Sequence, residues 1–431
     1  MENNPENKAR NGPPQQDEMK QALLRIFRLV RENSVLTDDG LVYWNATGSV
    51  FSNASNKSDS VGPQLYDGTS GIALFLAAYY VATKNADARD LALRFAARLR
   101  VDIEQMFTGA APALHRAIGT GGLTGLPSVS YALVRLADWL KMPELLESAR
   151  KVAMAITPQQ ILGEERFDIM GGCAGTLLSL LSFVEEVSAR EMDTGIAMEL
   201  ALLCGRRLLE TRTRNGSSPG AWLAVDSMAA SGFAHGATGI AYSLVRLFQH
   251  TGREEFLDAA LEGFAFERSL SSSGLQNRFH QAADHPPWRA SWCEGPPGIA
   301  LGRLLSLFAV NSNTLRYDLE EALSVTRALP ESPVDHLCCG NFGRADIMHY
   351  AGNMMGRMQL TEHARELARQ VLSRAVTSGF RFQPHSHHST REHNFERNPS
   401  LFLGLSGVGY TLLRLSYPDL FPSALFLETQ S

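Results

Sequence analysis

The chain has 431 residues, of which 44% are hydrophobic and 20% charged, and its formal net charge is -5. This balance provides no basic field of the kind that binds nucleic acid or an anionic membrane. No apolar run approaches the roughly 18 residues that a membrane-spanning helix requires, so we expect no membrane span.

The chain begins with a polar segment. Residues 1–20 are expected to be a disordered or linker segment, because the first part is rich in Asn, Pro, Gln and Gly and lacks the charged-then-apolar pattern of a leader. We therefore expect a cytoplasmic protein. Residues 21–431 are predicted to form a single domain, although length alone would allow two or three. The stretch from Asp39 to Pro63 is predicted to be a loop.

A Gly-x-x-Gly turn recurs seven times, at intervals of about 45 to 64 residues. Six of the seven copies lead directly into a stretch typical of a buried helix. The exception is the copy at Gly340/Gly343, which leads into a less apolar stretch. One such turn is weak evidence, but seven at near-regular spacing indicate a repeat. The copies lie at Gly68/Gly71, Gly122/Gly125, Gly172/Gly175, Gly236/Gly239, Gly295/Gly298, Gly340/Gly343 and Gly404/Gly407.

Amphipathic segments lie between the turns. In Ala88 to Ile103, apolar residues recur every fourth position, and Pro143 precedes a second such helix from Glu144 to Ile156. Val50 to Ser52 and Phe380 to Phe382 are too short to form a sheet that carries the fold. We predict an all-α fold, an α/α toroid of seven helical hairpins with inner and outer rings of about seven helices each.

Three of the five cysteines accompany these turns. Cys293, Cys338 and Cys339 each lie within two residues of the first glycine of a copy, so equivalent turns would bring their sulfurs together. Three protein ligands with one open position are typical of catalytic zinc, and the sequence predicts one Zn²⁺ whose fourth position is open to water or a substrate thiolate. Buried packing is the alternative for paired cysteines, and it is the interpretation we prefer for Cys173 and Cys204.

A histidine-rich tract, His385 to His388 with His393 beyond it, lies in a polar loop before the last repeat. Such a composition can bind metal, but a mobile rim is the preferred interpretation.

Several pieces of the chain resemble the lanthionine synthetase C-like (LanC-type) cyclases, over nearly the whole length from Leu65 to Pro422. The resemblance is closest to the cyclase half of class II bifunctional synthetases that have a three-cysteine site. It implies an α/α toroid with one zinc ion, which adds peptide cysteine thiols to dehydroalanine or dehydrobutyrine. The pieces that carry the resemblance are Leu65-Tyr66-Asp67-Gly68-Thr69-Ser70-Gly71-Ile72, Phe167-Asp168-Ile169-Met170-Gly171-Gly172, Ala234-His235-Gly236-Ala237-Thr238-Gly239, Arg289-Ala290-Ser291-Trp292-Cys293, Leu337-Cys338-Cys339-Gly340-Asn341 and Asn398-Pro399.

Thiol addition to a dehydroamino acid needs a cation for the developing oxyanion and an acid for the α-carbon. His235 is the candidate acid, Asp168 would orient or charge-stabilise it, and Arg289 would approach the oxygen; the resemblance supports all three. A helix-capping role for His235 and a surface position for Arg289 are the alternatives. A water beside the zinc is a second candidate for the proton donor.

The chain departs from the family pattern in two respects. Glu294 occupies a position that is often histidine in class II relatives, which adds negative charge beside the metal. No dehydratase precedes the cyclase region, so either the substrate is a precursor peptide dehydrated by a separate dehydratase, or the chain is an excised domain. Two other functions stay open: a LanC-like module that binds glutathione or a protein without forming rings, and an α/α-toroid glycosidase using carboxylates such as Asp67 and Asp168.

Overall fold

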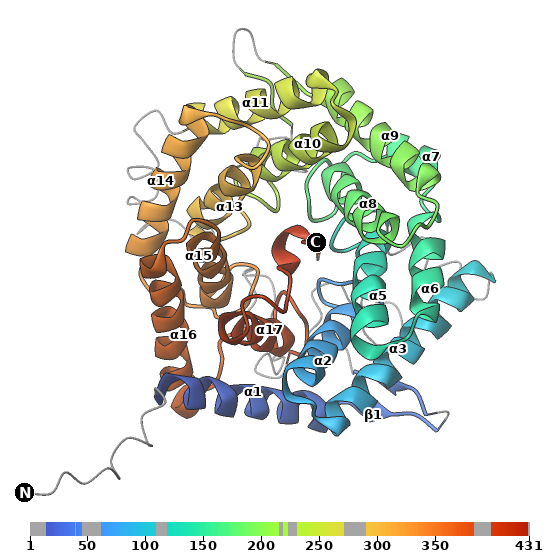
Figure 1. Ribbon diagram of the computed structural model, residues 1–431, viewed down its shortest axis with the longest axis vertical. Coiled ribbons are helices and arrows are strands. Elements are labelled where there is room, and N and C mark those ends of the chain that lie inside the picture. The colour runs from blue at the N-terminus through green and yellow to red at the C-terminus, as the bar shows by residue number, and fades with distance from the viewer. Residues whose placement is uncertain are drawn as a thin grey trace, which may run out of the picture.

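The computed structural model describes residues 14–38, 40–44, 62–108, 119–214, 219–222, 231–270, 290–382 and 398–429. Helices form two concentric rings, which confirms the predicted α/α toroid (Figure 1). The inner ring contains α2 (Thr69–Thr83), α5 (Leu126–Leu140), α8 (Cys173–Ser188), α10 (Ala237–Thr251), α13 (Pro296–Ser306), α15 (Asn341–Met354) and α17 (Leu405–Ser416).

The outer ring contains one partner for each inner helix. Six partners follow their inner helix along the chain, and the seventh comes from the amino terminus, where α1 (Pro14–Glu32) packs against α17. The first and last helices thus complete one hairpin and close the ring. The six partners are α3 (Ala86–Phe107), α6 (Glu144–Ala153), α9 (Gly195–Thr211), α11 (Glu254–Ser269), α14 (Asn313–Ala328) and α16 (Met358–Ser378).

Helix α1 begins at Pro14, inside the segment that the sequence assigned to a linker. Its buried residues recur at helical spacing and include Leu23, Ile26, Phe27 and Val30. Phe27 stacks on Tyr79 of α2, with ring centroids 4.9 Å apart. The division into a linker over residues 1–20 and one domain over residues 21–431 stays a prediction.

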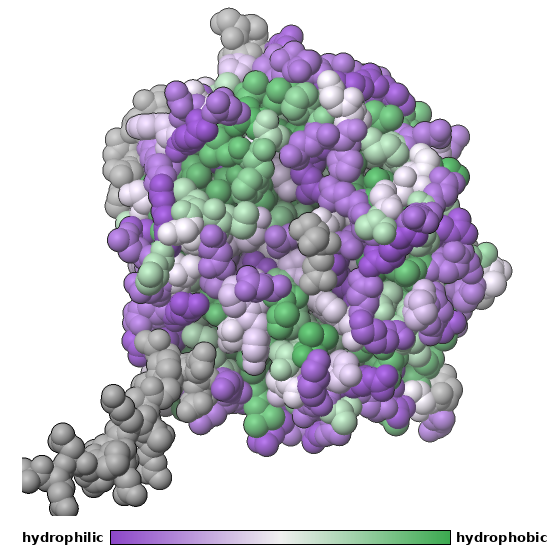
Figure 2. Space-filling model, viewed as in Figure 1, coloured by the Kyte–Doolittle hydropathy of each residue, from purple (hydrophilic) through white to green (hydrophobic). Residues whose placement is uncertain are grey.

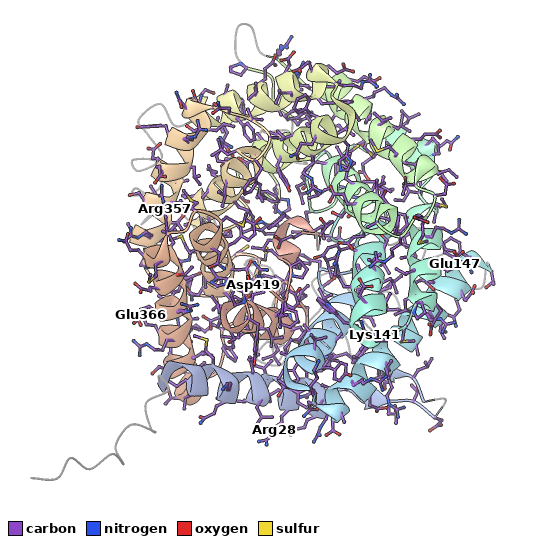
Figure 3. The ribbon with its side chains drawn as sticks, in the orientation of Figure 1. Arg28, Lys141, Glu147, Arg357, Glu366 and Asp419 are labelled. Atoms are coloured by element: carbon purple, nitrogen blue, oxygen red, sulfur yellow. The ribbon has the colours of Figure 1, made fainter. Side chains whose placement is uncertain are left out.

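The two rings differ in polarity because their helices meet different surroundings. Inner helices are buried almost all round; in α8, for example, most residues are inaccessible to solvent. Outer helices have one polar face, and Arg28, Glu147 and Glu366 lie on this outer ring in Figure 3. The space-filling view shows a largely hydrophilic perimeter, with hydrophobic residues gathered inside it over α10, α11 and α13 (Figure 2).

Regular structure outside the two rings is short in the described part of the chain. Strands β1 (Val35–Leu36) and β2 (Val42–Tyr43) pair antiparallel. The segment that was predicted as a loop from Asp39 onward therefore contains strand β2. Phe380–Phe382 forms no strand, and Arg381 instead exchanges backbone and side-chain hydrogen bonds with Asp335. Helix α7 (Pro158–Leu162) and the 3-10 helix η4 (Ala424–Phe426) complete the set. None of the helices described is both long and apolar enough to span a membrane.

The glycines of the repeated turns allow close backbone approach. In six of the seven copies the first glycine is the N-cap of its inner helix and is extended, with φ of -118° at Gly236, so no left-handed conformation is needed. A Cβ at the second glycine would collide with the carbonyl oxygen six residues earlier, as at Gly239, where it would meet Phe233 and also Ile169. Glycine is therefore required here by space.

The second copy of the turn lies three residues later than its predicted register. Gly125, the second glycine of the predicted pair, is the N-cap of α5, so it corresponds to the first glycine of the other copies. Ser128 takes the place of the second glycine. Its hydroxyl donates to the carbonyl of Gly125 at 2.7 Å and accepts from the N–H of Leu65 at 3.0 Å. Ser128 was not identified in the sequence analysis because Gly122 and Gly125 also have the Gly-x-x-Gly spacing.

The carboxyl-terminal segment after α17 fills the centre of the ring (Figure 1). It contacts the inner helices beyond their first turn: Ser182 donates to the carbonyl of Leu427 at 2.7 Å, and Ser423 donates to Asp346 at 2.9 Å. Phe426 packs against Tyr350, with ring centroids 5.1 Å apart. This segment therefore closes the side of the ring opposite the glycine turns.

Candidate metal centre

The seven turns meet in a circle of backbone hydrogen bonds. The residue two positions before the first glycine donates its N–H to the carbonyl of the equivalent residue in the next turn, at 2.9–3.2 Å, for six of the seven steps. The circle positions all seven turns against one another at one edge of the toroid. Its members are Tyr66, Leu123, Met170, Ala234, Cys293, Cys338 and Phe402.

The remaining step of the circle lies between Cys293 and Cys338. The N–H of Cys293 donates to the hydroxyl of Ser291 at 3.2 Å instead of to the next turn. At this step the sulfurs of the two cysteines face each other, and Cys339 joins them from the neighbouring position. The backbone circle is thus interrupted where the thiols converge.

The structure brings together the three cysteines singled out in the sequence. The Sγ atom of Cys293 lies 2.8 Å from that of Cys338 and 3.3 Å from that of Cys339, and the last two are 3.2 Å apart. All three are free thiols with exposures of 5%, 2% and 7%. Among the residues described, they form the one group of potential metal ligands whose donor atoms all lie within 4.8 Å of one another.

The donor set fits a single zinc ion. Two Zn–S bonds of about 2.3 Å span up to about 4.6 Å, so one ion can reach all three sulfurs. Thiolates are preferred zinc ligands, and three of them leave one position of a tetrahedron for a further ligand. Cys173 and Cys204 belong to a separate part of the core, where the thiol of Cys173 lies 3.5 Å from the carbonyl oxygen of Cys204.

Polar groups surround the sulfur cluster. The N–H of Cys339 donates to Nδ1 of His336 at 3.2 Å, and the buried side chain of Tyr66 stacks on Phe402, whose carbonyl accepts from the N–H of Cys338. Burial raises the pKa of the Cys338 thiol, but its contacts with Cys293 and Cys339 outweigh burial and lower that pKa well below its usual value.

His235 and Asp168 form the pair that the sequence predicted. Nδ1 of His235 lies 2.8 Å from a carboxylate oxygen of Asp168, whose other oxygen accepts from the N–H of Gly171 at 2.9 Å. The side chain of His235 remains 39% exposed, so the imidazole is accessible from outside the core. Burial lowers the pKa of His235, but the hydrogen bond and charge of Asp168 outweigh burial, with further contributions from Glu294 and Cys339, and the net pKa is raised.

Glu294 faces the same edge of the ring. It is partly buried, and its negative charge contributes to the raised pKa of His235. Its backbone carbonyl accepts a hydrogen bond from the hydroxyl of Ser231 at 2.9 Å. The negative charge of Glu294, which the sequence analysis expected beside the metal, therefore also acts on the imidazole of His235. Arg289 lies outside the described residues, as do His385 to His388 and His393.

Three neighbours of the centre were missed in the sequence. Tyr66 occupies the same position in its turn as Cys293 and Cys338, and His336 occupies the position of Asp168. Asn341 donates to the carbonyls of Ser332 and Val334 and to Asp335, which fixes the turn that carries Cys338 and Cys339. Aligning the turns position by position would have identified Tyr66 and His336.

Comparison with known proteins agrees with this architecture. The family model for lanthionine synthetase C-like protein matches residues 59–426. Nisin cyclase has a similar structure, with a TM-score of 0.57, 14% sequence identity and 94% of each chain covered. An unsaturated glucuronyl hydrolase specific for heparin gives a TM-score of 0.41 at 13% identity, covering 72% of this chain and 83% of its own. No curated protein matches the chain. Because the family model spans most of its length, the chain belongs to the lanthionine synthetase C-like family.

Proposed function

We propose that this protein is a zinc-dependent lanthipeptide cyclase. It adds cysteine thiols of a dehydrated precursor peptide to dehydroalanine or dehydrobutyrine and forms lanthionine or methyllanthionine rings. One observation carries the proposal: Cys293, Cys338 and Cys339 converge at the same edge of the ring as the His235–Asp168 pair. Family membership supports it.

Cys293, Cys338 and Cys339 would hold the metal. Zinc bound there supplies a site at which a substrate thiol, with an ordinary pKa near 8.5, loses its proton at neutral pH. Because all three protein ligands would be thiolates, their charge would outweigh that of a divalent ion and would favour donation of electron density from a substrate sulfur to carbon.

His235 serves as the proton donor. Sulfur forms a bond to the β-carbon of the dehydro residue, the double-bond electrons move toward the carbonyl oxygen, and the α-carbon then takes a proton. Asp168 fixes Nδ1 of the imidazole and leaves Nε2 to carry that proton to the substrate. Arg289 is proposed to stabilise the oxygen. The addition conserves all atoms, so the product has the mass of the dehydrated peptide.

The peptide is expected to approach from the turn side of the ring, because the carboxyl-terminal segment fills the other side. A separate dehydratase would prepare the substrate, and the reaction would take place in the cytoplasm. We propose no nucleic-acid partner.

Metal analysis combined with a thiol assay tests the proposal. Purified protein should contain one zinc per chain, and incubation with dehydrated precursor should remove alkylatable thiols without a change in mass. Cys339→Ala should abolish both properties, whereas Cys173→Ala, which removes a buried thiol elsewhere in the core, should preserve them.

Equal thiol loss with Cys339→Ala would show that the catalytic assignment is wrong. Zinc and glutathione binding without any thiol loss from the peptide would favour the alternative of a binding module that forms no rings.

A further inference from the structure

A buried carboxylate from the outer ring reaches the turn that carries His235. Glu267 lies in the last turn of α11, and its side chain is 1% exposed. One carboxylate oxygen accepts from the N–H of Gly232 at 2.6 Å, and the other accepts from the hydroxyl of Thr238. Gly232 comes three residues before His235 and Thr238 three residues after it, so this one carboxylate fixes both ends of the turn.

An arginine from the next inner helix holds this carboxylate in place. Arg303 of α13 lies 3.0 Å from Glu267 and donates to the Thr238 hydroxyl at 2.7 Å. Its Nε atom lies 3.2 Å from Asp318, which also pairs with Arg268 at 2.7 Å. Positive and negative charges alternate along this chain, so each buried charge faces an opposite one.

The turn that carries His235 packs directly against the turn that carries Cys293. Gly232 has φ of +94°, and a Cβ there would lie 2.3 Å from Cα of Glu294 and 2.4 Å from the carbonyl oxygen of Cys293. The N–H of Ala234 donates to the same carbonyl at 3.2 Å. A shift of Gly232 would therefore change the distance between the imidazole and the cysteine turn.

We propose that Glu267 is a positioning residue for ring formation, and that with Arg303 it holds His235 at the distance from the sulfur cluster that proton delivery requires. The inference rests on the proposed function, because it takes His235 as the proton donor. Buried ion pairs add little stability relative to apolar residues, so stability alone does not account for these charges. A misplacement of about 1 Å can cost about 10²-fold in rate. Loss of the Glu267 contacts should therefore slow the chemical step and leave peptide binding intact.

Glu267→Gln tests the inference because it keeps the length of the side chain. The amide nitrogen cannot accept from Thr238, and the neutral group cannot pair with the charge of Arg303. Initial rates are measured at a temperature at which the variants are folded, and we expect about 10²-fold lower kcat with unchanged KM and zinc content. Asp102→Asn is the matched control, since Asp102 is a buried carboxylate of outer helix α3 that pairs with Arg98. Its kcat should stay at the wild-type value.

Variants of Thr238 separate positioning from stability and decide the matter if Glu267→Gln does not fold. Thr238→Val keeps the shape of the side chain but lacks the hydroxyl, so kcat should fall and hydrogen exchange in residues 231–239 should become faster. Thr238→Ser keeps the hydroxyl and should restore most of the lost kcat. Ser406→Ala is the matched control: Ser406 occupies the equivalent position in turn seven, and its buried hydroxyl has no hydrogen-bond partner in the described part of the chain.

Three results would contradict the inference or its basis. Wild-type kcat in folded, zinc-loaded Thr238→Val and Glu267→Gln would overturn the inference and leave the proposed function intact. Equal loss of kcat in Thr238→Ser and Thr238→Val would overturn it too, because the hydroxyl would not be the cause. Absence of thiol loss with the unmodified protein would instead overturn the proposed function.

Discussion

At the scale of single residues, the protonation of His235 depends on one carboxylate. Burial acts to lower the pKa of the imidazole, and the bond to Asp168 acts in the opposite direction and prevails. Protonated His235 therefore persists above the ordinary histidine pKa of about 6.5. If it donates the proton to the α-carbon, activity should fall as pH rises through this raised value.

Asp168→Asn should shift that loss of activity to lower pH. Without the carboxylate charge, burial dominates and the pKa of His235 falls, so less of the acid is protonated at neutral pH. We expect about a 10²-fold lower rate at pH 7.5, together with an alkaline limb at lower pH in the rate profile. Asp90→Asn, at an exposed ion pair, is the control. If the alkaline limb of the Asp168→Asn rate profile stays at the wild-type pH, His235 is not the proton donor.

The His235–Asp168 pair also predicts how the free energy of unfolding changes with pH. Because the folded pKa of His235 is raised, its pairing with Asp168 stabilises the fold fully below the unfolded pKa near 6.5. This contribution is lost as pH rises through the folded value.

The sequence predicted the three cysteines because each accompanies a recognisable glycine turn. Tyr66 escaped notice because an aromatic residue before a buried helix normally indicates core packing. Its position near the cysteine turns also depends on closure of the ring, which makes turn one a neighbour of turn seven. Chain order alone does not reveal that neighbourhood.

At the scale of elements, the glycine turn is the unit that positions the chemistry. In six of the seven turns, a Cβ added to the second glycine would collide with the carbonyl oxygen six residues earlier, just ahead of the residue that belongs to the circle. At Gly239 that carbonyl belongs to Phe233, directly before Ala234 and His235. Any added atom must therefore displace the backbone that carries the imidazole.

Gly239→Ala should reduce both stability and activity. Its Cβ would collide with the Phe233 carbonyl and with Ile169, and such overpacking typically costs about 1–3 kcal/mol. Gly163→Ala provides the comparison: Gly163 is exposed, has a negative φ, and its Cβ would approach only the carbonyl of Gln159, at 3.2 Å. Denaturant unfolding measures both variants. Equal midpoints would show that the turn relaxes around a methyl group.

Periodicity predicted the inner helices well because they are apolar and follow an obvious turn. The misplaced second copy shows the limit of that signal. The sequence allows two registers, Gly122/Gly125 and Gly125/Ser128, and only the position of the N-cap at Gly125 identifies Ser128 as the replacement for the second glycine. Helix α1 was missed for another reason, since its amphipathic pattern begins within a polar segment.

At the scale of the whole molecule, the ring is closed by three different means. Helix α1 completes the last hairpin with α17, the carboxyl-terminal segment fills one side, and backbone hydrogen bonds connect the turns on the other. That circle is interrupted only at the step from Cys293 to Cys338 among the seven described turns. An ion bound by the three sulfurs would connect turns five and six across this interruption.

Metal removal should therefore loosen the two cysteine turns selectively. Without the ion, the connection between Cys293 and Cys338 loses its bridge, whereas turns one to four keep their backbone bonds. Hydrogen exchange, followed by mass spectrometry with and without a chelator, should show faster exchange in residues 290–298 and 334–343 and little change in residues 119–128. The melting temperature should fall as well, because binding to the folded state alone stabilises it. Uniform exchange around the ring would mean that the ion has no part in closing the circle, and that the six backbone bonds suffice to hold the sulfurs in place.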